Sequence, residues 1–293
     1  MCLAHEKLLF TTMTTALLLL KNTVCQFGFF FGILIAGGGV LTLISRFTNQ
    51  TFQQSRHPSL GLYIFGFIGV PVHEFCHALF CKLFFHEVKK VKWFDPKARG
   101  GANGFVMHSF NPWNPYHRIG HFFIGMGPVI LAPLILGILF YLLVPAGRGL
   151  YHADILSSGG IKAIALGLSQ AIFRRSTFET PGFYGFLYLS LCISSQMELS
   201  HEDMKQAVLG IFPLVALLAL INCAAWLFHF SWNQRAIQYG TLFLTANACI
   251  FTFAALLALA NLLLIKSVFF LCSGFTQEAG SAKTMRIKPT ARS

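Results

Sequence analysis

The sequence predicts an all-α polytopic membrane protein with about six transmembrane helices and a small β-hairpin inserted after the second helix. Hydrophobic residues make up 55% of the chain and charged residues 11%, whereas a soluble domain carries about 25% charged residues. The mean hydropathy is +0.63, and several apolar runs approach the roughly 20 residues that a helix needs to cross a bilayer. These observations leave room for one membrane domain and for no sizeable soluble domain.

The positive charge of the chain indicates how it lies in the membrane. Its net charge is +12 with the histidines neutral, which in a soluble protein would suggest a nucleic acid partner. Here we expect no nucleic acid and assign the charge to loops that meet the anionic lipid bilayer. Six spans put both termini on one side, where Lys and Arg are also more frequent. The positive-inside rule therefore places the termini and the 87–120 loop in the cytoplasm.

The apolar runs divide the chain into three parts. Residues 1–23 form an N-terminal segment that lacks the features of a cleaved secretory signal, residues 24–270 form a single membrane domain, and residues 271–293 form a basic, disordered cytoplasmic tail. Within the domain, the expected spans are 24–44, 60–85, 121–144, 182–195, 207–230 and 241–265.

The segments between the spans carry their own local signals. A polar loop is expected over 46–58, and two strands over 88–94 and 104–108 are expected to pair as a hairpin because turn residues separate them. The Gly-Met-Gly-Pro run at 125–128 predicts a weak point in its helix. The amphipathic stretch 161–173 is typical of a helix that lies in the membrane interface.

The second span contains the pattern His-Glu-x-x-His. Two histidines four residues apart on a helix are only about 40° apart around its axis, so His73 and His77 project from one face. This spacing suits two ligands of one Zn²⁺ per chain, with Glu74 placed to accept a proton from a water on the metal. A mid-membrane charge costs roughly 2.5–3.5 kcal/mol on the insertion scale, which favours a functional reason for these residues.

A structural interpretation of the same pattern exists. The two histidines could be core residues that face a polar neighbouring helix, with Glu74 protonated. A random match to the pattern inside an apolar span is rare for this composition, so we expect the metal site.

A zinc hydrolase needs a third protein ligand, and acidic residues are scarce in this chain. The polar cluster at 198–203 lies between two spans and offers Asp203, with Glu202 and His201 as alternatives. A competing interpretation gives the cluster no ligand at all, because Ser200-x-x-Asp203 resembles a capping box that starts a helix.

Together these residues resemble the site-2 protease family of intramembrane zinc metalloproteases, as a small, divergent member. The family motif H-E-x-x-H-A reads here as residues 73–78, followed by segments similar to its basic and Gly-rich strands at 88–94 and 100–110, and by a G-P pair at Gly127. The family's third ligand is an aspartate in a D-G motif, and the resemblance implies that Asp203 takes this role although Met204 follows it.

The resemblance implies hydrolysis of peptide bonds in transmembrane or membrane-proximal protein substrates by a zinc metalloendopeptidase. Glu74 is then the general base, and His73, His77 and Asp203 are the ligands. The alternative is a catalytically inactive scaffold or zinc-binding relative that recognises transmembrane helices. A metal transporter is disfavoured because only one helix carries a histidine pair.

Further polar residues near the hairpin leave the oxyanion partner open. Asn103, His108 and Asn111 are options, although each also suits a hydrogen bond within a loop. The remaining histidines of this region are interpreted as structural; they are His86, His117 and His121.

Overall fold

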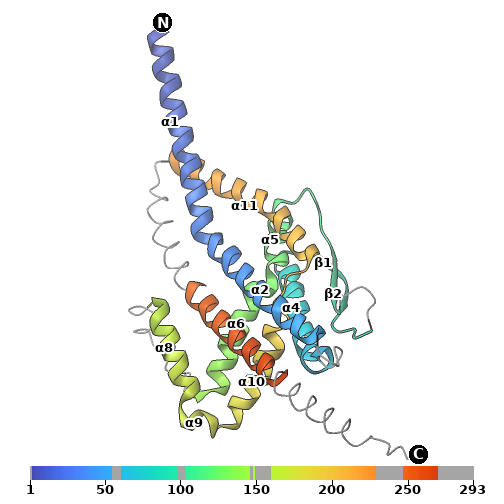
Figure 1. The fold of residues 1–293 in the computed structure, drawn as a ribbon. Coiled ribbons are helices and arrows are strands. Elements are labelled where there is room, and N and C mark those ends of the chain that lie inside the picture. Colours follow the sequence, from blue (N-terminus) through green and yellow to red (C-terminus); the bar gives the residue numbers. More distant parts are fainter. Residues whose placement is uncertain are drawn as a thin grey trace, which may run out of the picture.

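The computed structural model describes residues 2–54, 61–97, 103–145, 148, 160–228 and 247–269. Helices dominate these ranges, and one two-stranded sheet accompanies them (Figure 1). Four helices in these ranges are long and apolar enough to cross a membrane, and a fifth span results if one bent pair is counted together. A mostly helical chain with several candidate membrane spans and a small hairpin is thus confirmed, whereas the count of six spans stays a prediction.

The N-terminal part is one long helix. It comprises α1 (Cys2–Phe27), the π-helical turn η1 (Gly28–Gly32) and α2 (Ile33–Gln53), and its apolar part alone runs over the 41 residues Met13–Gln53. The expected span 24–44 lies inside it. The N-terminal half of α1 extends away from the other helices (Figure 1).

The sequence predicts a polar loop over 46–58. This prediction is wrong for residues 46–53, because they belong to α2. Two of its polar side chains bind the loop before α11 (His201–Leu227): Arg46 and Asn49 donate hydrogen bonds of 3.1 and 3.2 Å to the Glu198 carboxylate. Phe52 is buried and stacks on Phe65. Tertiary contacts therefore extend the helix beyond the point where its apolar pattern ends.

The helix with the histidine pair begins with a π-helical turn, η2 (Leu62–Gly66), and continues as α4 (Phe67–Leu83). Pro71 lies inside α4 without ending it. A proline cannot donate the usual backbone hydrogen bond, so one carbonyl in the preceding turn is left without its helical partner. Together these segments make an apolar span of 22 residues, Leu62–Leu83.

The predicted hairpin follows α4. Its strands are β1 (Glu87–Lys92) and β2 (Phe105–Ser109), which pair antiparallel with an irregularity in register between Val88 and Lys90. Each strand differs by one or two residues at its ends from the sequence prediction. The expected glycine turn at 100–101 lies outside the described residues.

The predicted weak point at 125–128 is confirmed. α5 (Pro115–Gly125) and α6 (Gly127–Leu143) meet at Met126 with a bend of 57°. Asn114 caps α5 by accepting a hydrogen bond from the Tyr116 backbone N–H, at 3.0 Å. The bend leaves α5 free to pack along a different helix from α6.

The remaining helices complete the bundle. They are α8 (Gly160–Phe173), α9 (Arg175–Phe178), α10 (Pro181–Ser194), α11 (His201–Leu227) and a last helix over Asn247–Phe269. α8 coincides with the stretch predicted at 161–173. α10 has only 14 residues and falls short of a full span. The tail predicted at 271–293 lies outside the described residues.

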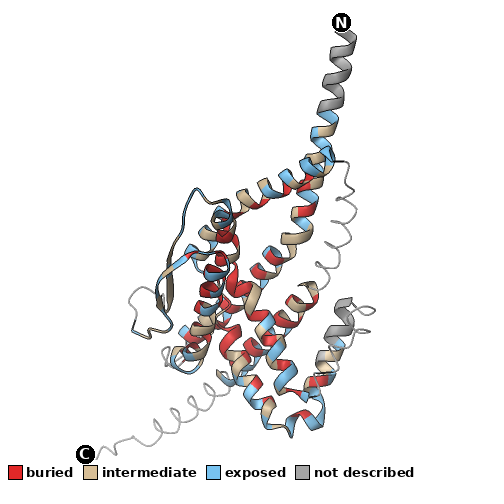
Figure 2. Ribbon diagram, turned by 180° about the vertical axis from the view of Figure 1, so that it is seen from behind, coloured by how far each residue is buried: buried red, intermediate tan, exposed pale blue. Residues whose placement is uncertain are grey.

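Buried residues concentrate where α4, α5, α6 and α10 meet, while residues 13–25 of α1 and the hairpin are more exposed (Figure 2). α11 is held at two points: its first half packs along α5, and Asn222 near its end exchanges amide hydrogen bonds of 3.1 and 2.9 Å with Gln26 of α1. Polar pairs of this kind join helices in an apolar surrounding. The first turn of α11 is thereby placed beside α4.

Candidate metal centre

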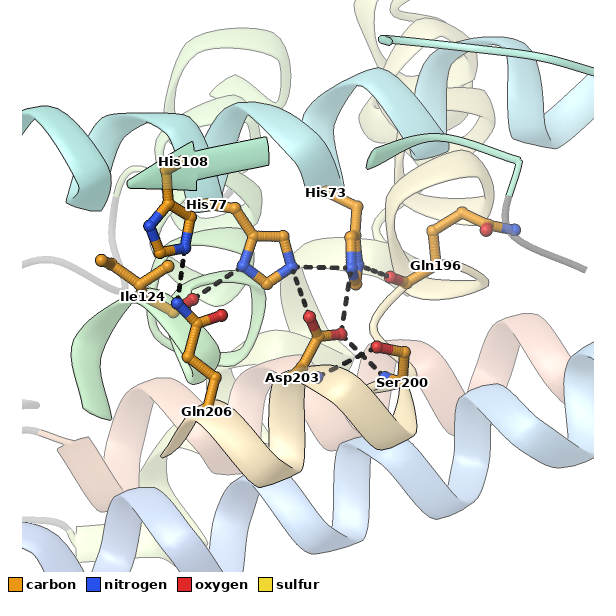
Figure 3. A network of polar contacts seen from close by, with 8 residues as sticks. All are labelled: His73, His77, His108, Ile124, Gln196, Ser200, Asp203 and Gln206. Atoms are coloured by element: carbon orange, nitrogen blue, oxygen red, sulfur yellow. Dashed lines mark hydrogen bonds and ion pairs between the residues drawn. The ribbon is translucent and has the colours of Figure 1, made fainter. Parts of the chain in front are cut away.

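Three side chains predicted from the sequence lie together between α4 and the first turn of α11 (Figure 3). One ligand atom from each of His73, His77 and Asp203 can be chosen so that all lie within 4.8 Å of one another. The two histidine Nε2 atoms are 3.1 Å apart. The Asp203 oxygens lie 3.3 Å from Nε2 of His77 and 3.7 Å from Nε2 of His73.

The other ring nitrogen of each histidine is held by a backbone carbonyl. Nδ1 of His73 contacts the carbonyl oxygen of Gln196, and Nδ1 of His77 contacts that of Ile124, both at 2.7 Å. A carbonyl only accepts, so each Nδ1 must carry the proton and donate it. In neutral rings both Nε2 atoms then present lone pairs toward each other and toward a carboxylate.

This donor set fits a metal ion. Two lone pairs and a carboxylate facing one point repel one another unless a cation lies between them. Histidines that bind zinc usually donate their second ring N–H to a carbonyl or carboxylate, as His73 and His77 do here. The group can therefore hold a metal ion, and two imidazoles with one carboxylate are a donor set that suits Zn²⁺.

Asp203 also caps its own helix. Its Oδ2 accepts the Ser200 backbone N–H at 2.8 Å, and its backbone N–H donates to Oγ of Ser200 at 3.1 Å. The capping box and the contact with the histidines, which the sequence presented as competing interpretations, thus occur together. The cap leaves Oδ1 facing His77 and fixes the carboxylate in place.

The two alternative ligands from the same cluster lie outside this group of three. His201 and Glu202 are exposed, and Glu202 is paired with Lys205 at 2.8 Å. Neither belongs to the metal-binding group found among the described residues. Proximity therefore favours Asp203 as the third ligand, and its ligation stays a prediction.

Glu74 is buried on the same helix as the two histidines, with 6% of its surface exposed. The chain enters β2 directly over it: a Cβ atom on Gly104 would lie 2.7 Å from Cγ and 2.8 Å from Oε1 of Glu74. Only a residue without a side chain allows the backbone to pass this close. The predicted base is therefore covered by the hairpin and lies beside the predicted ligands.

A cavity of about 840 Å³ adjoins the three predicted ligands and Glu74. Its walls come from the end of α2, from α4, from the start of β2 and from the segment 196–206. Both apolar side chains, such as Val70 and Phe105, and polar ones, such as Gln206, line it. The site thus opens into a space large enough for a stretch of peptide.

Only some of the possible oxyanion partners lie at the cavity. Asn103 and His108 line the cavity, whereas the side chain of Asn111 accepts the backbone N–H of Trp113 and so belongs to a turn. The backbone N–H of Asn111 also donates to Nδ1 of His117. Sequence reasoning missed Gln206, which lies on the cavity wall three residues after Asp203 and hence on the same helix face.

The histidines around the hairpin form a second cluster. Nδ1 of His86 lies 3.0 Å from Nδ1 of His108, and Nε2 of His86 lies 2.9 Å from the backbone oxygen of His117. Burial lowers the pKa of His108 to about 4 and also lowers the pKa of His86. Both rings are therefore neutral near pH 7. His121 is buried and packs against both.

Comparisons of the chain with protein-family models, with curated proteins and with solved structures find no match. The resemblance to the site-2 protease family, which residues 73–78 carry most strongly, stays a prediction. The function of the chain has to be inferred from the geometry of the site.

Proposed function

We propose that the chain is an intramembrane zinc metalloprotease that hydrolyses peptide bonds in transmembrane or membrane-proximal protein substrates. The observation that carries this proposal is the convergence of His73, His77 and Asp203 within 4.8 Å, next to the buried carboxyl of Glu74. Three protein ligands of this kind with one open position are typical of catalytic zinc sites, whereas structural zinc sites use four.

His73, His77 and Asp203 would hold one Zn²⁺ per chain. When bound, the ion supplies a Lewis acid that polarises the scissile carbonyl and acidifies a water molecule. Glu74 accepts the proton of the attacking water and delivers it to the amine that leaves. The backbone carbonyls of Gln196 and Ile124 keep both histidines in the tautomer that presents Nε2.

A transmembrane substrate has to unwind before it is cut, because its carbonyls are engaged in helical hydrogen bonds. Among the described residues β2 pairs only with β1, and Gly104, Phe105 and Val106 at its start line the cavity. An extended substrate segment can add to this free edge as a third strand. Strand addition would offer the unwound backbone new partners beside Glu74.

The proposal includes the orientation in the membrane. We infer six spans, with α10 crossing as a short segment, and a cytoplasmic position for both termini and for the 87–120 loop. A reporter fused after residue 293, together with cysteine labelling in the 87–120 loop, tests this topology. If the loop is labelled from outside the cell, the orientation in the membrane is the opposite of the one proposed.

The test of function uses the full chain in detergent. Metal analysis should find about one Zn²⁺ per chain, and His73→Ala and His77→Ala should each remove it. Casein serves as an unfolded probe because it needs no unwinding, and synthetic transmembrane peptides serve as membrane probes, with fragments identified by mass spectrometry. Glu74→Gln should keep the zinc and abolish cleavage.

The outcomes separate the proposal from its alternatives. Zinc binding without cleavage of any probe by the wild-type chain would favour an inactive zinc-binding scaffold. Cleavage that Glu74→Gln leaves undiminished would rule out the mechanism. If the double variant of His73 and His77 retained its zinc, these residues would not form the zinc site.

A further inference from the structure

A chain of hydrogen bonds links the surface of the hairpin region to the wall of the cavity. It begins at the backbone oxygen of His117, which lies 2.9 Å from Nε2 of His86. Nδ1 of His86 then lies 3.0 Å from Nδ1 of His108, and Nε2 of His108 lies 2.7 Å from Nε2 of Gln206. Four residues are thus connected in series: His86, which precedes β1, and one residue each on α5, β2 and α11.

The His117 carbonyl fixes which atom donates and which accepts in every later hydrogen bond of the chain. A carbonyl oxygen only accepts, so Nε2 of His86 donates to it, and Nδ1 of the same neutral ring is an acceptor. His108 must then donate from Nδ1, which leaves its Nε2 as an acceptor. Gln206 therefore has to turn its amide N–H, and not its oxygen, toward His108.

Burial supports this assignment because it keeps the relay rings uncharged. The pKa of both His86 and His108 is lowered by desolvation, so neither ring carries a second proton near neutral pH. A protonated His108 would have no acceptor to offer Gln206, and the amide would be released to rotate.

Within the part of the chain that the structure describes, this orientation leaves one N–H of Gln206 without an assigned partner. An amide nitrogen carries two hydrogens, and one of them is used by His108. Gln206 is half-buried, lines the cavity together with His77 and Asp203, and follows Asp203 by three residues on α11. Figure 3 shows Gln206 and His108 on the His77 side of the predicted ligands.

We propose that Gln206 is a catalytic residue whose free N–H donates to the oxygen of the scissile carbonyl, and that His86 and His108 are positioning residues that fix its amide. When water adds to the carbonyl carbon, the C=O π bond breaks and its electron pair moves to this oxygen. The oxygen becomes negative, and an N–H donor whose side chain is held in place before the reaction lowers the barrier most. This inference rests on the proposed proteolysis and names a further residue for it.

The test compares variants in the same zinc-loaded, detergent-solubilised full chain, with casein as the probe. Gln206→Met keeps the size and helical preference of the side chain but removes the donor. We expect kcat to fall by about 10²–10³-fold with KM nearly unchanged, as for other lost oxyanion donors. Zinc content and thermal unfolding should match the wild type, because Gln206 is not among the predicted ligands.

The positioning residues are tested through His108. His108→Phe removes the acceptor and should lower kcat by a smaller factor, and adding it to Gln206→Met should cause no further loss. His108→Gln retains an amide oxygen near the position of Nε2 and should restore much of the activity. A purely structural role predicts losses that multiply in the double variant and no difference between Phe and Gln.

The two proposals fail in different ways. If the wild-type chain cleaves neither casein nor transmembrane peptides, the proposed protease function is wrong, and this inference is wrong with it. A wild-type chain that cleaves, combined with a Gln206→Met variant of normal kcat, overturns only the role of Gln206. Loss of zinc in Gln206→Met also overturns it, since the side chain would then act on the metal site.

Discussion

The backbone of Asp203 lies directly against Gly125: a Cβ atom on this glycine would be 2.4 Å from the Asp203 carbonyl oxygen and 2.6 Å from the Ala207 nitrogen. Backbone atoms cannot give way as a flexible side chain can. α5 and α11 therefore touch along their backbones at the turn that carries the predicted third ligand. Gly125 also follows Ile124, whose carbonyl holds His77. One helix contact thus positions two of the three predicted ligands.

The first prediction concerns this contact. Gly125→Ala should push the start of α11 away from α5, because the added methyl group would overlap with the backbone of Asp203. The displacement moves the carboxylate relative to His77, so zinc affinity should fall by about 10–100-fold, as for other changes around metal ligands. Competition with a chromophoric zinc chelator measures the affinity.

Gly39→Ala is the matched control for this prediction. Gly39 lies on α2, where an added Cβ atom meets no atom within 4 Å. The change should leave zinc affinity unaltered and stabilise the helix by about 0.5–1 kcal/mol. If Gly125→Ala binds zinc as tightly as Gly39→Ala does, the contact does not position the metal site.

The second prediction concerns the cover over the predicted base. A methyl group at position 104 would overlap with Glu74 and with Val70, so Gly104→Ala should displace the Glu74 side chain or lift the start of β2. Zinc should remain bound, but casein cleavage should fall by about 10²-fold, since a shift of about 1 Å can cost this much. Unchanged cleavage would mean that Glu74 does not need this packing.

The third prediction concerns pH. The pKa of His108 is lowered from 6.5 to about 4 by burial, and the pKa of His86 is lowered in the same sense. The unfolded chain therefore takes up protons between about pH 6.5 and pH 4 that the folded chain does not. Stability should fall as the pH drops through this window and level off below it. Thermal unfolding in detergent between pH 7.5 and pH 4 measures the loss.

The same experiment on His108→Gln isolates the contribution of this ring. The variant lacks the titrating group, so its stability should depend less on pH within the window. An equal acid dependence in both proteins would assign the effect to other groups.

The parts of the site that come from local sequence were predictable. His73, Glu74 and His77 follow from helical spacing alone, and the hairpin follows from strand residues on both sides of turn signals. Asp203 was one of several options, because the spacing between helices does not tell which residue of a polar cluster faces a distant metal. Packing decides this: the glycine contact with α5 and the cap with Ser200 turn Asp203 inward.

The parts that come from the backbone and from long-range contacts could not be predicted. The carbonyls of Gln196 and Ile124 hold the two histidines, and every residue has a carbonyl, so the sequence carries no signal for them. The extension of α2 to Gln53 likewise depends on Glu198, which lies about 150 positions further along the chain. A periodicity argument considers only neighbouring residues and misses such partners.

The fourth prediction separates the two roles of Asp203. Its carboxylate accepts the Ser200 N–H and faces both histidines, so Asp203→Ala removes a cap and a predicted ligand together. Two neutral imidazoles hold Zn²⁺ poorly and leave its charge unbalanced. Asp203→Ala should therefore lose zinc and abolish cleavage as His73→Ala does, and it should also lose stability. Metal analysis, cleavage of casein and thermal unfolding measure the three effects.

Ser200→Ala supplies the comparison, because it removes only the hydroxyl that caps the Asp203 N–H and leaves the backbone N–H that binds the carboxylate. It should lose about 0.5–2 kcal/mol of stability and keep its zinc. If Asp203→Ala also keeps its zinc and loses no more stability than Ser200→Ala, the aspartate is only a helix cap. Glu202 and His201, which line the same cavity as the two histidines, should then be tested as the third ligand.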